Sequence, residues 1–141
     1  MADDSSDFAR SMGIATSGLR AQAGRMRVIS ENIANSDSTA PTAGGDPYRR
    51  KVPTFSSALD RTLDAKVVTL GKVRPDQSAF RTKYEPSNPA ADASGNVKYP
   101  NVNPLVEMTD MREAQRSYEA NINVIGATRR MIQKTIEILK A

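Results

Sequence analysis

The chain has 141 residues, about the length of one domain, and its net charge of +4 is only a small excess of basic residues. It contains no cysteine and no histidine, which excludes disulfide bonds, thiolate chemistry and the usual zinc ligands. The N-terminus is acidic and no long apolar run occurs, so we expect neither a cleaved signal peptide nor membrane insertion.

A long helix is predicted over residues 8–35, after a disordered lead at residues 1–7. Ser6 or Asp7 is available as its N-cap, and Asn35, which accepts the left-handed conformation, is expected to end it. Apolar and near-apolar residues recur with the alternating three- and four-residue spacing of a helix that packs a narrow seam against another helix. This seam consists of Phe8, Met12, Ala15, Leu19, Gln22, Met26, Ile29 and Ile33.

The face beside this seam carries small residues, namely Gly13, Ser17, Gly18, Ala21 and Gly24. Small residues let another part of the chain approach closely, which would place contacts on more than one side of the helix. Alternatively, the glycines are merely tolerated, at a cost of about 1 kcal/mol each in helix propensity. The sequence leaves both interpretations open.

The middle segment, residues 36–103, loses the helical pattern, and all eight prolines lie between Pro41 and Pro104. Residues 66–73 and 78–84 alternate well enough to predict two short strands, joined by a hairpin turn at residues 74–77. A third strand is expected at residues 97–99. The middle is therefore predicted to be a small domain of strands and loops.

A second long helix is predicted over residues 104–141, with Asn103 as its N-cap and Pro104 in its first turn. Acidic residues come early and basic residues late, the order that the helix dipole favours. At about 1.5 Å per residue this helix would be roughly 50 Å long, too long to be buried within a small globule. Its seam consists of Met108, Met111, Gln115, Tyr118, Ile122, Ile125, Arg129, Ile132, Ile136 and Leu139.

The two seams can be aligned antiparallel, with Ile33 facing Met108 and Leu19 facing Ile122. The predicted fold class is mainly α with a small β-rich insert, in which the terminal helices form an elongated, antiparallel, coiled-coil-like pair and one inner domain. Ile136 and Leu139 then extend beyond the partner helix. Such leftover apolar residues indicate either packing against neighbouring subunits or a hairpin with frayed ends, and both remain open.

Candidate catalytic and binding residues are few. Glu107 and Asp110 form an acidic pair, but acids in the first turn of a helix usually serve the helix dipole. The basic cluster Arg49–Lys51 is a candidate for phosphate contacts, although such clusters are more often solvated loops or interface contacts. We expect no catalytic residue, metal, cofactor, small-molecule substrate or nucleic-acid partner.

Several motifs resemble the flagellar basal-body rod proteins. The most specific is the Glu-Asn-Ile-Ala-Asn sequence at residues 31–35, and residues 84–86, 95–103, 107–111 and 116–121 resemble the proximal-rod branch of that family. Residues 37–45 and 56–66 carry no distinctive motif. The motif residues are Glu31, Asn32, Ile33, Ala34, Asn35, Tyr99, Pro100, Asn101, Asn103, Ser117, Tyr118, Glu119, Ala120 and Asn121.

The resemblance implies a structural, non-enzymatic subunit of the proximal rod of the bacterial flagellar basal body. Such a subunit polymerises helically, with its terminal helices in the inner layer, and transmits motor torque to the distal rod and hook. The resemblance also implies export through the flagellar type III apparatus, without a cleaved signal, to the periplasmic rod. The expected partners are other copies of the chain and other rod proteins, and the seam residues are the expected polymer contacts.

Two alternatives remain open at this stage. A coiled-coil adaptor or secretion-associated chaperone acting as a small oligomer would also carry two long helices. Asn32 and Asn35 either bond a neighbouring chain in the polymer or, in the case of Asn35, only cap the helix.

Overall fold

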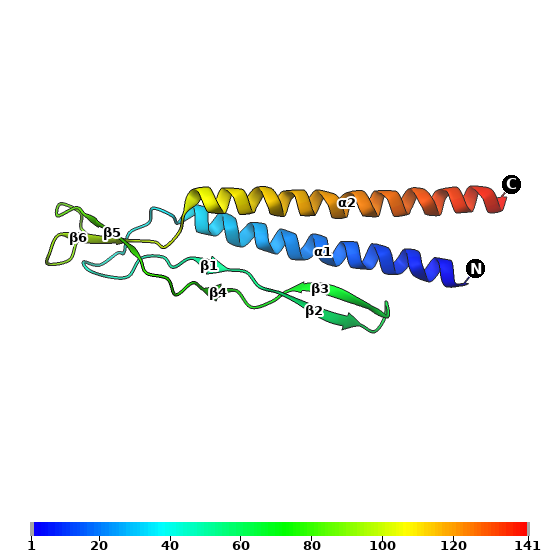
Figure 1. The fold of residues 1–141 in the computed structure, drawn as a ribbon, viewed down its shortest axis with the longest axis horizontal. Helices are drawn as coiled ribbons and strands as arrows, with labels where there is room; N and C mark the ends of the chain where they lie inside the picture. Colours follow the sequence, from blue (N-terminus) through cyan, green and yellow to red (C-terminus); the bar gives the residue numbers. More distant parts are fainter. Residues whose placement is uncertain (1, 141) are drawn as a thin grey trace. The chain divides into compact units, whose positions relative to one another are not determined.

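The computed structural model describes residues 2–140, with side chains from residue 6 onward. Two long helices, α1 (Ala2–Ala34) and α2 (Pro104–Lys140), stand at the two ends of the chain (Figure 1). Between them, the described residues form three two-stranded antiparallel ladders. These pair β1 (Lys51–Val52) with β4 (Arg74–Pro75), β2 (Phe55–Asp60) with β3 (Ala65–Leu70), and β5 (Arg81–Tyr84) with β6 (Asn96–Tyr99). Two terminal helices with a small β-rich middle were predicted, and this architecture is confirmed.

Helix α1 begins earlier and ends differently from the prediction. It begins at Ala2, so the residues predicted as a disordered lead belong to the helix from Ala2 onward, while Met1 lies outside the described residues. Acidic sequence also suits the first turn of a helix. The helix ends at Ala34, but Asp64 is the one non-glycine residue of the described chain with positive φ, so Asn35 is not a left-handed cap. Asn35 Nδ2 instead donates to Glu31 O, at 2.8 Å.

Helix α2 begins as predicted. Asn103 Oδ1 accepts a hydrogen bond from Leu105 N at 3.1 Å, and Glu107 N donates to Asn103 O at 3.1 Å. Asn103 is therefore the N-cap, and Pro104 occupies the first position of the helix, where its missing N–H costs nothing.

The strand pairing differs from the prediction. Strands were expected at residues 66–73 and 78–84 with a hairpin turn between them, but β3 pairs with β2 and β5 pairs with β6. The β2–β3 turn is closed by Asp60, whose Oδ1 accepts from Thr62 N at 2.9 Å and from Leu63 N at 3.3 Å. This turn lies within residues 56–66, where no motif was recognised, whereas residues 74–75 pair with β1 instead of turning.

The chain divides into two compact units, each built from a part of both helices and a part of the middle segment. The first comprises Met1–Met26, Thr54–Lys72 and Glu113–Ala141, and the second comprises Arg27–Pro53 and Val73–Arg112. This division cuts across the predicted one, which assigned the helices to one domain and residues 36–103 to another. The β2–β3 hairpin belongs with the helices because it packs on α1.

In the first unit, the small-residue face of α1 receives side chains from two elements. A Cβ placed on Gly13 would lie 2.3 Å from Leu63 Cδ1, and one on Gly24 would lie 2.6 Å from Leu70 Cδ2, both of the hairpin. A Cβ on Gly18 would lie 2.8 Å from Asn121 Oδ1 of α2. Of the two interpretations left open above, close contact is therefore the one that the structure supports.

In the second unit, the core combines buried apolar residues with buried polar ones. Its most buried members are Val28, Ile29, Asn32, Val97, Pro100, Val102 and Glu107. The polar members lie where the end of α1, the segment around β1 and the start of α2 meet, and they form the site described next.

Candidate functional site

The centre of the second unit is the side chain of Asn32, which is 1% exposed. Its Nδ2 donates to Glu107 Oε2 at 3.0 Å and to Lys51 O at 2.8 Å. Its Oδ1 accepts from Tyr48 OH and from Lys51 N, both at 2.9 Å. All hydrogen-bonding positions of this amide are thus occupied inside the unit, and Asn32 joins α1 to α2 and β1.

Glu107 is the second buried member of this network and is also 1% exposed. Its Oε1 accepts from Arg50 Nε at 2.6 Å. Arg50 is further placed near Asp76 at 3.5 Å and Asp110 at 3.8 Å. Burial acts to lower the pKa of Arg50, but the hydrogen bond and charge of Glu107, together with Asp76, raise it above its ordinary value. The buried carboxylate is therefore held opposite a permanent cation.

The basic cluster Arg49–Lys51 has internal partners for each of its side chains. Arg49 lies over the Phe80 ring, 4.1 Å from its centroid, and donates to Asp76 O at 3.1 Å. Lys51 pairs with Glu31. Burial, together with the negative charges of Glu31 and Glu107, raises the pKa of the neighbouring Tyr48 to about 12. These contacts account for the cluster structurally, without a nucleic-acid partner.

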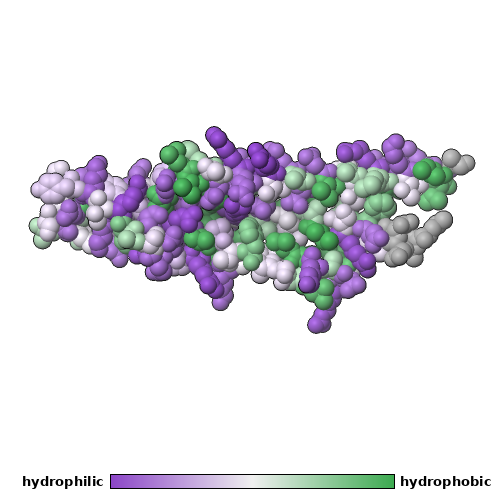
Figure 2. Space-filling view, in the orientation of Figure 1, coloured by the Kyte–Doolittle hydropathy of each residue, from purple (hydrophilic) through white to green (hydrophobic). Residues whose placement is uncertain are grey.

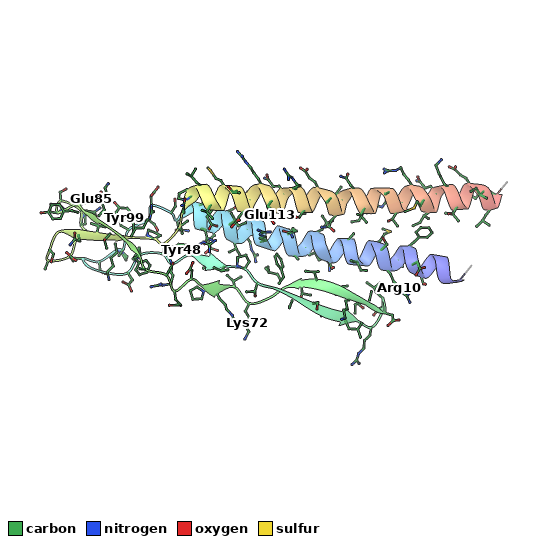
Figure 3. All side chains as sticks on the ribbon, in the orientation of Figure 1. Arg10, Tyr48, Lys72, Glu85, Tyr99 and Glu113 are labelled. Atoms are coloured by element: carbon green, nitrogen blue, oxygen red, sulfur yellow. The ribbon has the colours of Figure 1, made fainter. Side chains whose placement is uncertain are left out.

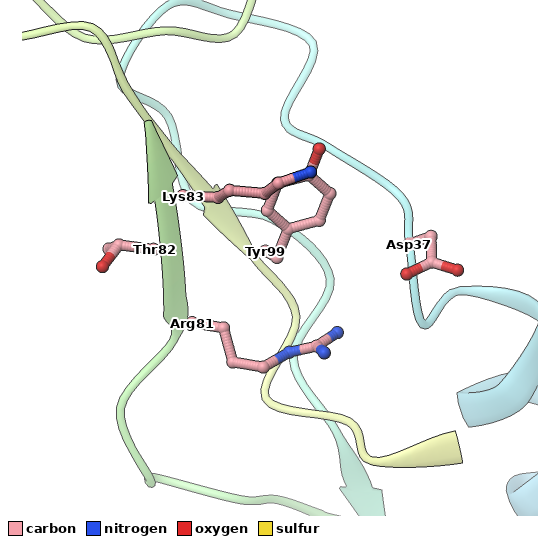
Figure 4. A pocket seen from close by; sticks show the side chains of 5 residues that line it. All are labelled: Asp37, Arg81, Thr82, Lys83 and Tyr99. Carbon is pink, nitrogen blue, oxygen red and sulfur yellow. The ribbon is translucent and has the colours of Figure 1, made fainter. Parts of the chain in front are cut away.

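The motif residues at 99–101 also bond within the second unit. Asn101 Oδ1 accepts from Arg50 N at 2.8 Å, and its Nδ2 donates to Ser78 Oγ at 2.9 Å. Arg81 donates to Pro100 O and to Ser36 O, each at 3.1 Å. Arg81 and Tyr99 line a shallow pocket with Asp37, Thr82 and Lys83 (Figure 4). Because Arg81 is engaged by backbone carbonyls, this pocket offers no arrangement for catalysis.

Glu85 and Tyr99 form a second polar cluster, near the β5–β6 ladder (Figure 3). Glu85 Oε2 accepts from Tyr99 OH at 2.9 Å and from Asn88 Nδ2 at 3.1 Å, and Lys83 Nζ lies 2.6 Å from Glu85 Oε1. The hydrogen bond from Lys83, with those from Asn88 and Tyr99, lowers the pKa of Glu85 to about 2.

On α2, the buried face differs from the seam predicted from the sequence. The innermost column, spaced by seven residues, is Glu107, Ala114, Asn121 and Thr128, of which all but the half-buried Asn121 are fully buried. Asn121 Nδ2 donates to Ser117 O at 2.9 Å, and Thr128 Oγ1 donates to Val124 O at 3.0 Å. Polar side chains can occupy this column because their own helix satisfies them. Their modest size also lets the small residues of α1 approach.

Half of the predicted α2 seam is consequently exposed. Met111, Tyr118, Ile125 and Ile132 are half-buried, whereas Met108, Ile122, Ile136 and Leu139 are exposed. The register expected from the sequence, with Ile33 facing Met108, is displaced, since Asn32 bonds Glu107 instead. A second exposed apolar column consists of Val124, Met131 and Ile138. Figure 2 shows hydrophobic side chains at the C-terminal end of α2. Their role as polymer contacts stays a prediction.

On α1, the predicted seam residues Ala15 and Ile29 are buried, and the others are partly buried. The helix also buries Ala21, Val28 and Asn32, which the seam did not include. Gln22 Oε1 is buried without a hydrogen-bond partner among the described residues. The small-residue face was the sequence signal that pointed to Ala21.

Among the residues that the structure describes, no cluster of three or more potential metal ligands occurs. None of the described helices is both long and apolar enough to span a membrane.

Comparison with known proteins identifies the family. A family model described as flagella basal body rod protein matches residues 12–40, and one described as flagellar basal body rod FlgEFG protein C-terminal matches residues 93–138. The flagellar basal-body rod protein FlgC of Agrobacterium fabrum is 54% identical over 128 residues, which cover 91% of this chain and 92% of that protein. The chain belongs to the FlgC family of flagellar basal-body rod proteins.

More distant FlgC proteins match over similar lengths. That of Bacillus subtilis is 40% identical, with 92% of this chain and 97% of the relative covered. That of Salmonella typhimurium is also 40% identical, with 89% and 92% covered. The two matched family models include the Asn32 and Glu107 ends of the network, while residues 41–92, with strands β1 to β5, lie between the matched segments.

Proposed function

We propose that this chain is a structural subunit of the flagellar rod and not an enzyme. The observation that carries this proposal is the similarity to FlgC proteins along about nine-tenths of the chain. The exposed apolar columns of α2 support it, because contiguous apolar surface on a small protein marks an interaction face.

The finer assignment follows the family. The subunit belongs to the proximal rod, polymerises helically with itself and with other rod proteins, and transmits torque toward the distal rod and hook. The flagellar type III apparatus exports it to the periplasm without cleavage of a signal peptide.

The terminal helices form an antiparallel, coiled-coil-like pair in the assembled subunit. Two contacts of the first unit support this pairing: Gly18 lies against Asn121, and Arg25 lies 3.6 Å from Glu113. Residue numbers rise along α1 as they fall along α2. The polymer contacts are then the residues that this pairing leaves exposed, such as Met131 and Ile136.

The coiled-coil adaptor is not favoured, because the matched relatives are rod proteins throughout their length.

The proposal is tested by replacing Met131, which is 50% exposed on α2, with Asp in the organism's own gene. The charge should abolish assembly and swimming, while secretion of the subunit continues and the purified monomer keeps its circular dichroism. Gln133→Asp places the same charge at an exposed polar position of the same helix and serves as the matched control. Normal swimming of the Met131→Asp strain, or of a strain that lacks the chain, would contradict the proposal.

A further inference from the structure

The second unit contains a groove between the end of α1, the residues before and in β1, and the residues in and before β4. Its volume is about 870 Å³. We call it the basic groove and define it by Arg27, Tyr48, Arg49, Lys51, Val73 and Pro75. All of these residues belong to the second unit, so the groove is a feature of one compact body.

The chemistry of the basic groove combines apolar walls with positive charge. Val28 lines it as a buried residue, and Val73 is 38% exposed beside it. Arg27, Arg49 and Lys51 face one carboxylate, Glu31, which pairs with Lys51. The Phe80 ring and the backbone carbonyls that Arg49 contacts are neutral. The groove therefore suits a segment that is acidic and partly apolar.

The same chain carries such a segment at its N-terminus. The sequence opens Met-Ala-Asp-Asp-Ser-Ser-Asp-Phe, with three aspartates before the first basic residue, Arg10. Phe8 and Met12 follow as apolar residues. This start is complementary to the basic groove in both charge and apolar character.

The segment cannot reach the groove of its own molecule. Helix α1 runs without interruption from Ala2 to Ala34, so Asp7 and Arg27 are separated by about 30 Å along one helix. The contact must therefore join two copies of the chain. A contact between two different surfaces of identical subunits is heterologous, and it produces an open helical polymer when it does not close into a ring.

We propose that the basic groove binds the acidic N-terminal start of α1 from a second copy of this chain. The inference rests on the proposed function, since it names one head-to-tail contact of the polymer. The occupant is committed to this chain because the charge complementarity and the polymer geometry both arise from it.

The lack of cysteine makes a direct test possible, because any introduced thiol is the only one in the protein. Ala9→Cys, exposed near the acidic start, and Val73→Cys, beside the groove, are made in two separate proteins. Mixed under oxidising conditions, they should give a disulfide-linked heterodimer. Ser94→Cys, exposed on a loop that does not line the groove, replaces Val73→Cys in the control mixture. Crosslinking should be about tenfold slower in high salt, since opposite charges steer the encounter.

Charge exchange supplies the second test. Arg27→Glu, at an exposed position, should slow the crosslink strongly, and Asp4→Arg in the partner protein should restore it. Arg112→Glu makes the same charge change on an exposed residue outside the groove and should have no effect.

The outcomes separate the inference from the proposed function. Equal crosslinking with Val73→Cys and Ser94→Cys, or no rescue by Asp4→Arg, overturns the groove contact, even if the chain assembles into rods. A crosslink that forms with these charge effects, in a protein whose deletion leaves rods and swimming intact, supports the contact and overturns the rod function.

Discussion

At the scale of single residues, the buried network of the second unit provides specificity more than stability. Glu107 and Arg50 must both leave water, which costs several kcal/mol per ion and offsets most of their attraction. What the pair does achieve is a single arrangement, because Asn32 and Glu107 have no other partners at the end of α1. The network therefore fixes which residues of the two helices meet.

Replacing Glu107 by Ala should destabilise the monomer by about 3–5 kcal/mol, because Arg50 would lose its buried partner. Urea unfolding followed by circular dichroism measures this change. Glu119→Ala removes an exposed carboxylate from the same helix and should change the free energy of unfolding by less than about 0.5 kcal/mol. Equal effects of the two variants would show that the network is energetically neutral.

Glu85 should couple the order of the β5–β6 region to acid. Its pKa is lowered from 4.5 to about 2, so its contribution to folding is present above pH 4.5 and is lost as the pH falls toward 2. A carboxyl-detected NMR titration measures this pKa directly. In Tyr99→Phe, which lacks one donor to the carboxylate, the pKa should rise, and an unchanged value would contradict the assigned hydrogen bond.

At the scale of elements, α1 and α2 approach through small residues, while the larger apolar side chains of α2 point elsewhere. This explains why spacing alone misplaced half of the α2 seam: apolar periodicity located Met111, Tyr118, Ile125 and Ile132 but selected Met108 and Ile122 over Glu107 and Asn121. A column of Glu, Ala, Asn and Thr is not recognisable as a seam until the helix backbone that satisfies its polar members is known.

Two glycines, one on each helix, make a matched test of this close approach. Gly126→Ala should stabilise the monomer by about 1 kcal/mol through helix propensity, because its Cβ would lie 3.6 Å from Arg130 Nη1, an ordinary contact. Gly18→Ala should lose this gain, since its Cβ would lie 2.8 Å from Asn121 Oδ1. Thermal unfolding measures both. A Gly18→Ala protein as stable as Gly126→Ala would argue against the contact.

At the scale of the whole molecule, the two units are held by different means. The second unit has a satisfied polar network and most of the large buried side chains. The first unit buries small residues such as Ala15, Ala21 and Ala114. Every described α2 residue from 133 to 140 is exposed. The second unit should therefore be the more stable of the two before assembly.

Native-state amide hydrogen exchange of the monomer tests this expectation. Amides of the second unit, including residues 28–34 and 107–112, should exchange more slowly than those at the start of α1 and the end of α2. In isolated basal bodies the difference should diminish, because neighbouring subunits cover the exposed columns. Uniform protection of both helices in the monomer would contradict the expectation.

The sequence was sufficient for the two helices, the Asn103 cap and the small-residue face, because each depends on residues close together in the chain. The β2–β3 pairing was not predictable, since its turn relies on Asp60 and on an Asp64 conformation that no motif announces. The network was also missed, because Asn32, Arg50 and Glu107 are distant in sequence and meet only in the folded unit.

The hydrogen bonds of Asn32 have a consequence for the chemical ageing of the protein. Deamidation would replace its amide with a carboxylate, removing both donors and placing a negative charge beside Glu107. The reaction requires attack by the following backbone nitrogen, which in this chain belongs to Ile33 within the helix. The arrangement that makes this position intolerant of deamidation thus also slows it, an advantage for a subunit that must last as long as the structure it builds.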